Sequence, residues 1–305
     1  MARVAFLGPE GTFTSQAAMR AAPEADRVAL PSIAEVIAAV RDHRTELGVV
    51  PLENSIEGSV NLTLDELAFG APGAYIRGEI TVPIAMNLLG RPGRHLAAIT
   101  AVRSQPHALA QCRRWLDANL PGVQLQAATS TAEAAREAAA SGDGIAALGP
   151  AVAAEIFGLE ILAADVHDFD GNTTRFAVLG SAMAARTGAD KTSLVVFFGE
   201  DRPGLLLRIL DEFALRGVNL TKIESRPTKQ ALGEYCIFID CAGHLTDARV
   251  AEALRSVHRH AAEVRVLGSY PRADANPDHP GPADSDEAYA EASDWFRGVT
   301  GDVDP

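Results

Sequence analysis

The sequence predicts a mixed α/β protein, with a two-lobed first part followed by a smaller α+β domain. Up to about residue 180, short apolar runs alternate with helical patterns in two successive series, which indicates two parallel-type lobes. The order then changes to strand, helix, strand, strand, helix, strand over residues 192–271, which is typical of a ferredoxin-like domain. At 305 residues, the chain is long enough for this organisation.

The first lobe is expected to comprise about residues 1–80 and 168–180. Short apolar runs between turn residues predict strands at 3–7, 28–30, 47–52 and 174–180. Helices are expected over 13–22, 32–43 and 60–69. The second of these begins at Ser32 with Glu35 three residues later, the pattern of a capping box.

The second lobe is expected to comprise about residues 81–167. A strand-like segment at 75–89 leads into it, and its remaining strands are expected at 98–102, 124–128 and 145–148. Helices are expected over 106–118, 131–140 and 150–157. Two α/β lobes joined by crossover segments predict a hinged cleft, the architecture of periplasmic-binding-protein-like folds.

A linker over residues 181–191 precedes the ferredoxin-like pattern. That pattern has strands at 192–198, 218–227, 234–241 and 263–270, with helices over 204–216 and 246–258. The tail, residues 272–305, is acidic and rich in Pro, Gly and Ala, so we expect it to be disordered apart from an amphipathic turn near 286–297.

Composition excludes several classes of function. The net charge of −13 argues against nucleic acid or an anionic membrane surface as a partner. Three cysteines without a CxxC pair favour reduced thiols over a disulfide framework or a metal site. The N-terminus enters a strand without a secretory signal, and no apolar run could span a membrane, so a cytoplasmic location is expected.

Polar residues gather where the predicted strands end. The Gly8–Thr12 turn leads into a helix N-terminus and is suited to binding an anion, although its spacing does not match a dinucleotide fingerprint. Asn54, Ser55 and Glu57 follow the third strand, at the edge where open α/β sheets bind ligands. The alternative is that Asn54 and Ser55 only cap the next helix.

The second lobe and the returning strand add further candidates. Ser104 is placed to cap the helix that carries Gln111, and Thr129 belongs to a Thr-Ser-Thr cap whose hydroxyls face either the cleft or only the helix backbone. Thr174 and Arg175 begin the strand that returns to the first lobe, which puts them at the seam between lobes. A threonine hydroxyl can donate to a leaving hydroxyl, and arginine can bind a carboxylate.

Three stretches carry a resemblance to a known family. They are Phe6–Phe13 (FLGPEGTF), Val50–Ser59 (VPLENSIEGS) and Thr174–Phe176 (TRF). Occurring in this order, they resemble the signature set of the prephenate dehydratases of phenylalanine biosynthesis. The resemblance extends from residue 1 to about residue 270. Because the dehydratase-like strand begins at residue 3, we expect no fused chorismate mutase.

The resemblance implies a catalytic domain over residues 1–180 that converts prephenate to phenylpyruvate without a metal or cofactor. It implies that Thr174, Arg175 and Glu57 are catalytic, with Thr174 polarising the leaving hydroxyl and Glu57 a second proton-donor candidate if it is buried. The implied substrate-binding residues are Thr12, Asn54, Ser55, Ser104, Gln111, Thr129 and Phe176. The family has His before the proline that follows Ser104 and Gln after it, whereas here Gln105 and His107 are exchanged.

Residues 192–271 resemble an ACT regulatory domain. The motifs are Glu200–Leu206, Gly217–Leu220 and the Glu224–Pro227 tetrapeptide, whose sequence ESRP is associated with phenylalanine-sensing dehydratases. The resemblance implies L-phenylalanine as the effector and a homodimer or homotetramer that builds its site. The implied effector-binding residues are Gly204, Leu205, Leu206, Asn219, Glu224, Ser225 and Arg226.

Two other functions fit the pattern. An arogenate dehydratase differs only in acting on a substrate with an amino group where prephenate has a keto group. A non-catalytic amino-acid sensor would use the same two-lobed cleft, because fold alone does not give function. The joint presence of Asn54, Ser104 and Thr174 with their motifs argues against the sensor.

Overall fold

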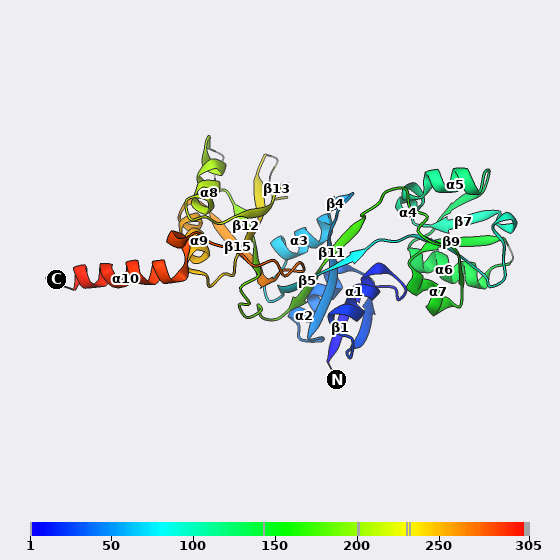
Figure 1. Ribbon diagram of the computed structural model, residues 1–305, viewed down its shortest axis with the longest axis horizontal. Helices are drawn as coiled ribbons and strands as arrows, with labels where there is room; N and C mark the ends of the chain where they lie inside the picture. Colours follow the sequence, from blue (N-terminus) through cyan, green and yellow to red (C-terminus); the bar gives the residue numbers. More distant parts are fainter. Residues whose placement is uncertain (1, 143, 200–201, 230, 232, 302–305) are drawn as a thin grey trace. The chain divides into compact units, whose positions relative to one another are not determined.

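The computed structural model describes residues 2–142, 144–199, 202–229, 231 and 233–301. The chain forms two compact units (Figure 1), in agreement with the predicted mixed α/β class. Unit 1 comprises Met1–Ala74 and Ile80–Ser181, and unit 2 comprises Tyr75–Glu79 and Ala182–Pro305. Among the described residues, no helix has both the length and the apolar content that crossing a membrane requires.

The first lobe of unit 1 is built on a sheet with strand order β11-β3-β1-β2. Its strands are β1 (Arg3–Leu7), β2 (Asp26–Leu30), β3 (Leu47–Asn54) and β11 (Thr173–Gly180). β1 pairs in parallel with β2 and β3, and β11 pairs antiparallel with β3. The helices are α1 (Phe13–Ala21), α2 (Ile33–Arg41) and α3 (Asn61–Phe69), and a two-residue strand β4 (Gly58–Ser59) pairs with β3.

The second lobe is a five-stranded sheet, β10-β6-β9-β7-β8, with helices on both faces. The strands are β6 (Asn87–Gly90), β7 (Ala101–Ser104), β8 (Gln124–Ala127), β9 (Ile145–Gly149) and β10 (Glu160–Ala163). One core cluster contains residues of α4 (Pro106–Gln111) and α5 (Arg113–Asn119), and another contains residues of α6 (Thr131–Ala140) and α7 (Ala151–Phe157). A 3-10 turn (Leu96–Ala98) precedes β7, and β10 lacks a clear apolar pattern and was not predicted.

The helix predicted over residues 106–118 is divided at Cys112. The Asp168 carboxylate accepts the backbone N–H groups of Arg114 and Trp115 at 2.8 and 3.1 Å. These are N–H groups of the first turn of α5, which have no partner within the helix. A residue distant in sequence therefore caps a new helix start, which local sequence could not indicate.

Two connecting segments join the lobes side by side. The predicted 75–89 strand is divided into β5 (Tyr75–Pro83) and β6, with Ile84–Met86 between them. Ile84 N donates to Asn172 O at 2.8 Å, and Val166 N donates to Met86 O at 2.7 Å. The segment that enters the second lobe is therefore hydrogen-bonded to the segment that leaves it. The two connections together form a two-stranded hinge for the cleft.

Unit 2 has the predicted ferredoxin-like order, with neighbouring strands β13-β14-β12-β15 all antiparallel. Its elements are β12 (Asp190–Phe197), α8 (Leu205–Ala214), β13 (Leu220–Pro227), β14 (Tyr235–Ala242), α9 (Ala248–His260) and β15 (Glu263–Pro271). Residues of α8 and α9 form one core cluster with residues of β12 and β14.

The tail differs from the sequence expectation of disorder with one turn. It contains a 3-10 turn (Pro282–Asp284) and a fifteen-residue helix, α10 (Asp286–Thr300). Ser285 caps the helix by accepting the N–H of Ala288 at 3.2 Å, and Asp286 accepts the N–H of Ala248 at 2.8 Å. The cap and the anchor at its first turn explain why the helix forms, although none of its residues is buried.

All three cysteines, Cys112, Cys236 and Cys241, are free and buried. Burial is the main cause that raises the pKa of Cys112 and of Cys241 to about 12. The thiols of Cys112 and Cys241 therefore stay protonated at neutral pH and pack as small apolar groups.

Candidate active site

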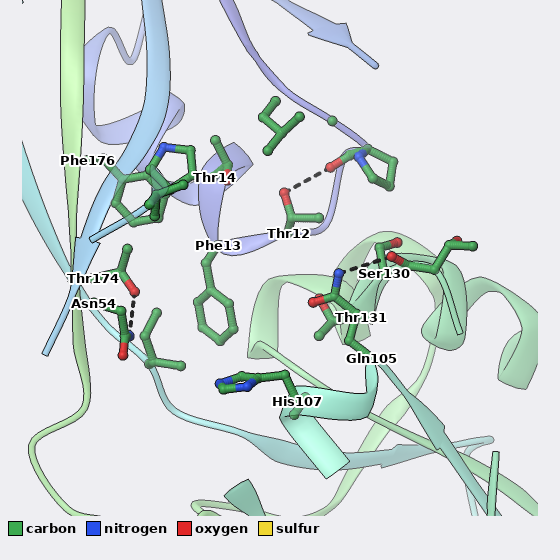
Figure 2. Close-up of a pocket in the computed structure, with 18 of the residues that line it drawn as sticks. Thr12, Phe13, Thr14, Asn54, Gln105, His107, Ser130, Thr131, Thr174 and Phe176 are labelled. Atoms are coloured by element: carbon green, nitrogen blue, oxygen red, sulfur yellow. Dashed lines mark hydrogen bonds between the residues drawn. The ribbon is translucent and has the colours of Figure 1, made fainter. Parts of the chain in front are cut away.

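A cavity of about 860 Å³ lies between the two lobes of unit 1, within the size range of small-molecule sites. Figure 2 shows Phe13, His107 and the Asn54–Thr174 pair around one common space. The first lobe contributes Thr12, Phe13, Thr14, Asn54, Glu57, Thr174 and Phe176 among others. The second contributes Gln105, His107, Gln111, Thr129, Ser130, Thr131 and Glu133.

Thr174 and Asn54 face the cavity because their strands are paired in register. Thr174 of β11 lies opposite Asn54 of β3, so both side chains project from the same face of the sheet. Asn54 Nδ2 donates to Thr174 Oγ1 at 2.9 Å, as the dashed line in Figure 2 marks. Thr174 is 8% exposed. Its hydroxyl thus accepts from Asn54 and keeps its own hydrogen available to a ligand.

A chain of hydrogen bonds continues from Asn54 to the second lobe. Asn54 Nδ2 also donates to Asn172 Oδ1 at 2.7 Å, and Asn172 Nδ2 donates to Gln111 Oε1 at 3.3 Å. Gln111 Nε2 donates to Glu57 Oε1 at 2.9 Å and lies 2.9 Å from His107 Nε2. Neutral amides therefore connect the threonine to the opposite wall of the cleft.

Asn54 is fixed from both ends. Its Oδ1 accepts the backbone N–H groups of Ile56 and Glu57 at 2.9 and 3.0 Å, while both hydrogens of Nδ2 are used in the network. All four hydrogen-bonding positions of an asparagine amide are thus occupied. Asn54 accordingly sets the path of the loop after β3 and the orientation of Thr174 together.

Two helix N-termini open into the cavity. Thr12 caps α1 by accepting the N–H of Ser15 at 3.2 Å, and Ser130 caps α6 by accepting the N–H of Glu133 at 2.9 Å. The remaining first-turn N–H groups and the helix dipoles favour an anion there. Hydrogen bonding to Arg136 holds the pKa of Glu133 below its usual range, so Glu133 is ionised at neutral pH.

Among the described residues that line the cavity, none is arginine or lysine. Arg175 does not line it: its Nη2 pairs with Glu53 Oε2 at 2.8 Å. The register sets Arg175 opposite Glu53, on the other face of β11 from Thr174. The hypothesis that Arg175 holds a substrate carboxylate therefore lacks geometric support in this structure.

Two predicted substrate-binding serines also lie outside the cavity lining. Ser104 is fully buried and donates to Leu148 O at 2.8 Å, instead of capping the helix as expected, because it is the last residue of β7. Ser55 is exposed and accepts the N–H of Thr173 at 3.0 Å, which ties the loop after β3 to the start of β11. Both hydroxyl groups therefore form hydrogen bonds to backbone groups.

The remaining predictions for the cleft have mixed outcomes. Thr12, Gln111, Thr129 and Phe176 all line the cavity with Asn54, Glu57 and Thr174. Glu57, however, is exposed, so the burial on which its role as a proton donor depended is absent. His107 is exposed but also contacts the Glu57 carboxylate, a contact that was not predicted. Its spacing of four residues from Gln111 was the available signal.

Comparisons with known proteins identify the family to which this chain belongs. A sequence model of the prephenate dehydratase family matches residues 4–184, which is more than half of the chain. The chain belongs to the prephenate dehydratase family. An ACT domain model matches residues 192–259. A prephenate dehydratase of Mycobacterium tuberculosis is 43% identical over 97% of this chain and 93% of the relative, and one of Mycobacterium marinum is 42% identical over 97% and 95%.

Solved structures give the same family. The prephenate dehydratase of Arthrobacter aurescens, solved in complex with L-Phe, has a TM-score of 0.90, with 43% identity over 98% of this chain and 100% of that one. The Staphylococcus aureus prephenate dehydratase has a TM-score of 0.75, with 30% identity over 88% and 99%. A protein described as a quorum-quenching acylase has a TM-score of 0.80, with 31% identity over 88% and 98%. The fold alone therefore does not determine the reaction.

In the ACT domain, the predicted effector residues fall on two elements. Gly204 precedes α8 with φ of 84°, a backbone conformation that favours glycine, and Leu205 and Leu206 form the first turn of the helix. Asn219 is exposed just before β13. The N-terminus of α8 is thus accessible beside an exposed Leu206, as an effector site there would need.

The Glu224–Arg226 stretch lies on β13, an edge strand of the sheet. Glu224 and Arg226 lie on one face and are half-buried, whereas Ser225 is on the other face and exposed. Glu224 forms ion pairs with Lys222 at 3.3 Å and with Arg226 at 3.6 Å. Glu224 and Arg226 therefore pair with each other on the sheet edge.

Proposed function

We propose that this chain catalyses the decarboxylating dehydration of prephenate to phenylpyruvate in L-phenylalanine biosynthesis. Family membership supports the reaction, and the single observation that carries its chemistry is the Asn54–Thr174 hydrogen bond at the cavity wall. Prephenate loses its ring carboxylate as carbon dioxide and its 4-hydroxyl as hydroxide, which takes up a proton to become water. The ring becomes aromatic, so the step is strongly downhill.

Thr174 acts as a polarising donor to the departing hydroxyl. A threonine hydroxyl is too weak an acid to give up its proton at neutral pH, but a positioned donor stabilises the charge that develops on the leaving oxygen. Because Asn54 already donates to Thr174 Oγ1, the threonine hydrogen is directed away from Asn54 and toward the ligand. The proton that completes water comes from solvent or from a group that the ligand brings close.

The anionic groups of prephenate are held without arginine or lysine. The N-termini of α1 and α6 supply backbone N–H groups at the cavity, capped by Thr12 and Ser130. Neutral donors bind a carboxylate without preventing its loss as carbon dioxide. A tight ion pair would instead stabilise the ground state as much as the transition state and would not accelerate the reaction. Phe13 and Phe176 provide apolar walls for the ring.

L-Phenylalanine is the proposed allosteric effector of the ACT domain. The relative solved with L-Phe and the accessible N-terminus of α8 support this assignment. The proposal includes a homodimer or homotetramer, because the effector sites of ACT domains lie between paired modules, and a cytoplasmic location. The expected coupling of ~1–3 kcal/mol corresponds to inhibition of about 5- to 150-fold.

The reaction is tested by ultraviolet detection of phenylpyruvate from prephenate, with and without L-phenylalanine. We expect turnover that L-phenylalanine suppresses. Turnover that is insensitive to phenylalanine would keep the reaction and remove the regulatory assignment. Turnover of arogenate but not of prephenate would make the chain an arogenate dehydratase. Binding of an amino acid in the cleft without either reaction would favour the sensor.

The effector site is tested separately with Asn219→Ala. Asn219 is exposed, so the substitution leaves the fold intact. We expect normal uninhibited turnover and at least a fivefold loss of sensitivity to L-phenylalanine. Sensitivity equal to that of the unmodified chain would remove Asn219 from the effector site. Gln16→Ala on α1 in unit 1 is the control that changes a half-buried side chain elsewhere.

A further inference from the structure

The carboxylate of Glu57 is held by nitrogen atoms from the opposite lobe. Glu57 belongs to the loop after β3, whereas His107 and Gln111 lie one helical turn apart on α4. Gln111 Nε2 donates to Glu57 Oε1 at 2.9 Å, and His107 Nε2 contacts the same oxygen atom. A carboxylate beside Nε2 favours the imidazole form that carries a hydrogen there, so both nitrogens donate to one oxygen.

This pair of donors is distinctive in the cavity. Among the described residues that line it, His107 is the one side chain that can carry a positive charge. The two carboxylates in the lining are Glu57 and Glu133, and Glu133 is already paired with Arg136. A dianionic ligand therefore finds side-chain charge complementarity only at the position that Glu57 now occupies.

Glu57 is able to leave that position without disturbing the rest of the site. Its side chain is 42% exposed, so it can turn into solvent by a change of rotamer. Its backbone stays fixed, because Asn54 Oδ1 accepts the N–H of Glu57. Gln111 also keeps its orientation, because Asn172 Nδ2 donates to its Oε1. Its Nε2 then continues to point to the position that the Glu57 carboxylate occupied.

We propose that His107 Nε2 and Gln111 Nε2 form a subsite for a substrate carboxylate, and that Glu57 occupies it as an internal substitute until the ligand displaces it. This inference rests on the proposed function, which supplies a ligand with a carboxylate. It assigns Glu57 as a competitor of the substrate in place of a proton donor. It also gives a role to His107, the residue exchanged with Gln105 relative to the family pattern.

The test is equilibrium binding of phenylpyruvate to the full-length chain, measured by titration calorimetry at fixed ionic strength. Glu57→Ala frees both donors, so we expect the Kd to fall by about tenfold; His107→Ala removes one donor, so we expect it to rise by about tenfold. In the His107→Ala background, removal of Glu57 should tighten binding by clearly less than tenfold, because it then frees only Gln111 Nε2. Equal effects of Glu57→Ala with and without His107 would overturn the proposal.

Glu133→Ala is the matched control for charge. It also removes one carboxylate from the cavity lining, but Glu133 pairs with Arg136 on its own helix. A Kd that falls as much for Glu133→Ala as for Glu57→Ala would mean a general electrostatic effect and would contradict the subsite. Opposite, coupled shifts in a chain that does not turn over prephenate would uphold the subsite and overturn the proposed reaction. Turnover of prephenate without coupled effects of Glu57→Ala and His107→Ala on the Kd would uphold the proposed reaction and overturn the subsite.

Discussion

The cleft of unit 1 and the tail attachment of unit 2 handle charge in opposite ways. The cavity is lined mainly by amides, hydroxyls and apolar groups around two helix N-termini, with two carboxylates and one histidine but no arginine or lysine among its described residues. In unit 2, Arg186 pairs with Asp247 and with Asp286 of the tail, and Arg249 pairs with Asp278. In this molecule the tail is thus attached through arginine ion pairs, whereas the cleft has no permanently charged cation among its described lining residues to bind an anion.

The largest effect should come from breaking the neutral network of the cleft. Asn54→Asp removes both N–H donors, leaves Thr174 without its partner and adds a negative charge to an anion site. We expect kcat for prephenate to fall by about a hundredfold or more, comparable to losing one oxyanion donor of ~2.7–4 kcal/mol. Steady-state kinetics measures this.

Asn172→Asp is the matched control for that prediction. It adds the same negative charge and keeps the oxygen that accepts from Asn54, but it removes the donation to Gln111 instead of the one to Thr174. Its loss of kcat should therefore be smaller than that of Asn54→Asp. Equal losses would mean that added charge, and not the bond to Thr174, determines the rate.

A second prediction concerns a hydroxyl that supports the cleft without lining it. Ser104→Ala leaves the buried Leu148 carbonyl without its side-chain donor. We expect unit 1 to lose about 1–3 kcal/mol of stability, with KM for prephenate unchanged. Urea unfolding followed by Trp115 fluorescence, in a Trp295→Phe background, measures the loss. A raised KM with normal stability would return Ser104 to the substrate site.

The smallest expected effect concerns the ion pairs of unit 2. The N–H of Ala248, and then Arg186, hold the pKa of Asp286 below its usual range. Its contribution is therefore fully present above the ordinary Asp pKa of 3.8 and is lost as pH falls through the lower folded value. At pH 7, Asp286→Asn should lower the free energy that protects the first-turn amides of α9 from hydrogen exchange. The expected decrease is that of a lost helix cap, ~0.5–2 kcal/mol.

Hydrogen exchange of the Ala248–Val250 amides checks this prediction. The difference between the unmodified chain and Asp286→Asn should shrink as the pH falls below the ordinary Asp pKa of 3.8 and through the lower folded value, because both side chains are then neutral. A difference that stays constant with pH would mean that the Asp286 carboxylate charge does not anchor the tail. Asp294→Asn, on an exposed turn of the same helix, is the control.

Much of the fold follows from local patterns. Ser32 accepts the N–H of Glu35 and Ser130 that of Glu133, as their spacing from the acidic residue predicts. The ferredoxin-like order of unit 2 follows from its alternation of strands and helices. The break at Cys112 and the anchoring of α10 could not be predicted, because Asp168 and Asp286 act on helices distant in sequence.

The residues of β11 that reach the cavity were predicted from motif resemblance and residue chemistry, whereas strand periodicity explains which of them do so. Thr174 and Phe176 face the cavity together, and alternation along β11 places Arg175 on the opposite face. The prediction for Arg175 relied on its chemical type and disregarded that alternation. The spacing of His107 from Gln111 was a local signal, but its contact with Glu57 could not be predicted, because Glu57 comes from the other lobe.

The central claim is that the Thr174 hydroxyl polarises the leaving group. Comparing kcat for prephenate in Thr174→Val and Thr174→Ser tests it most directly, because valine keeps the shape and serine keeps the hydroxyl. The account predicts that valine lowers kcat by roughly a hundred- to a thousandfold, while serine retains most of the rate. Near-normal kcat in Thr174→Val would contradict the account.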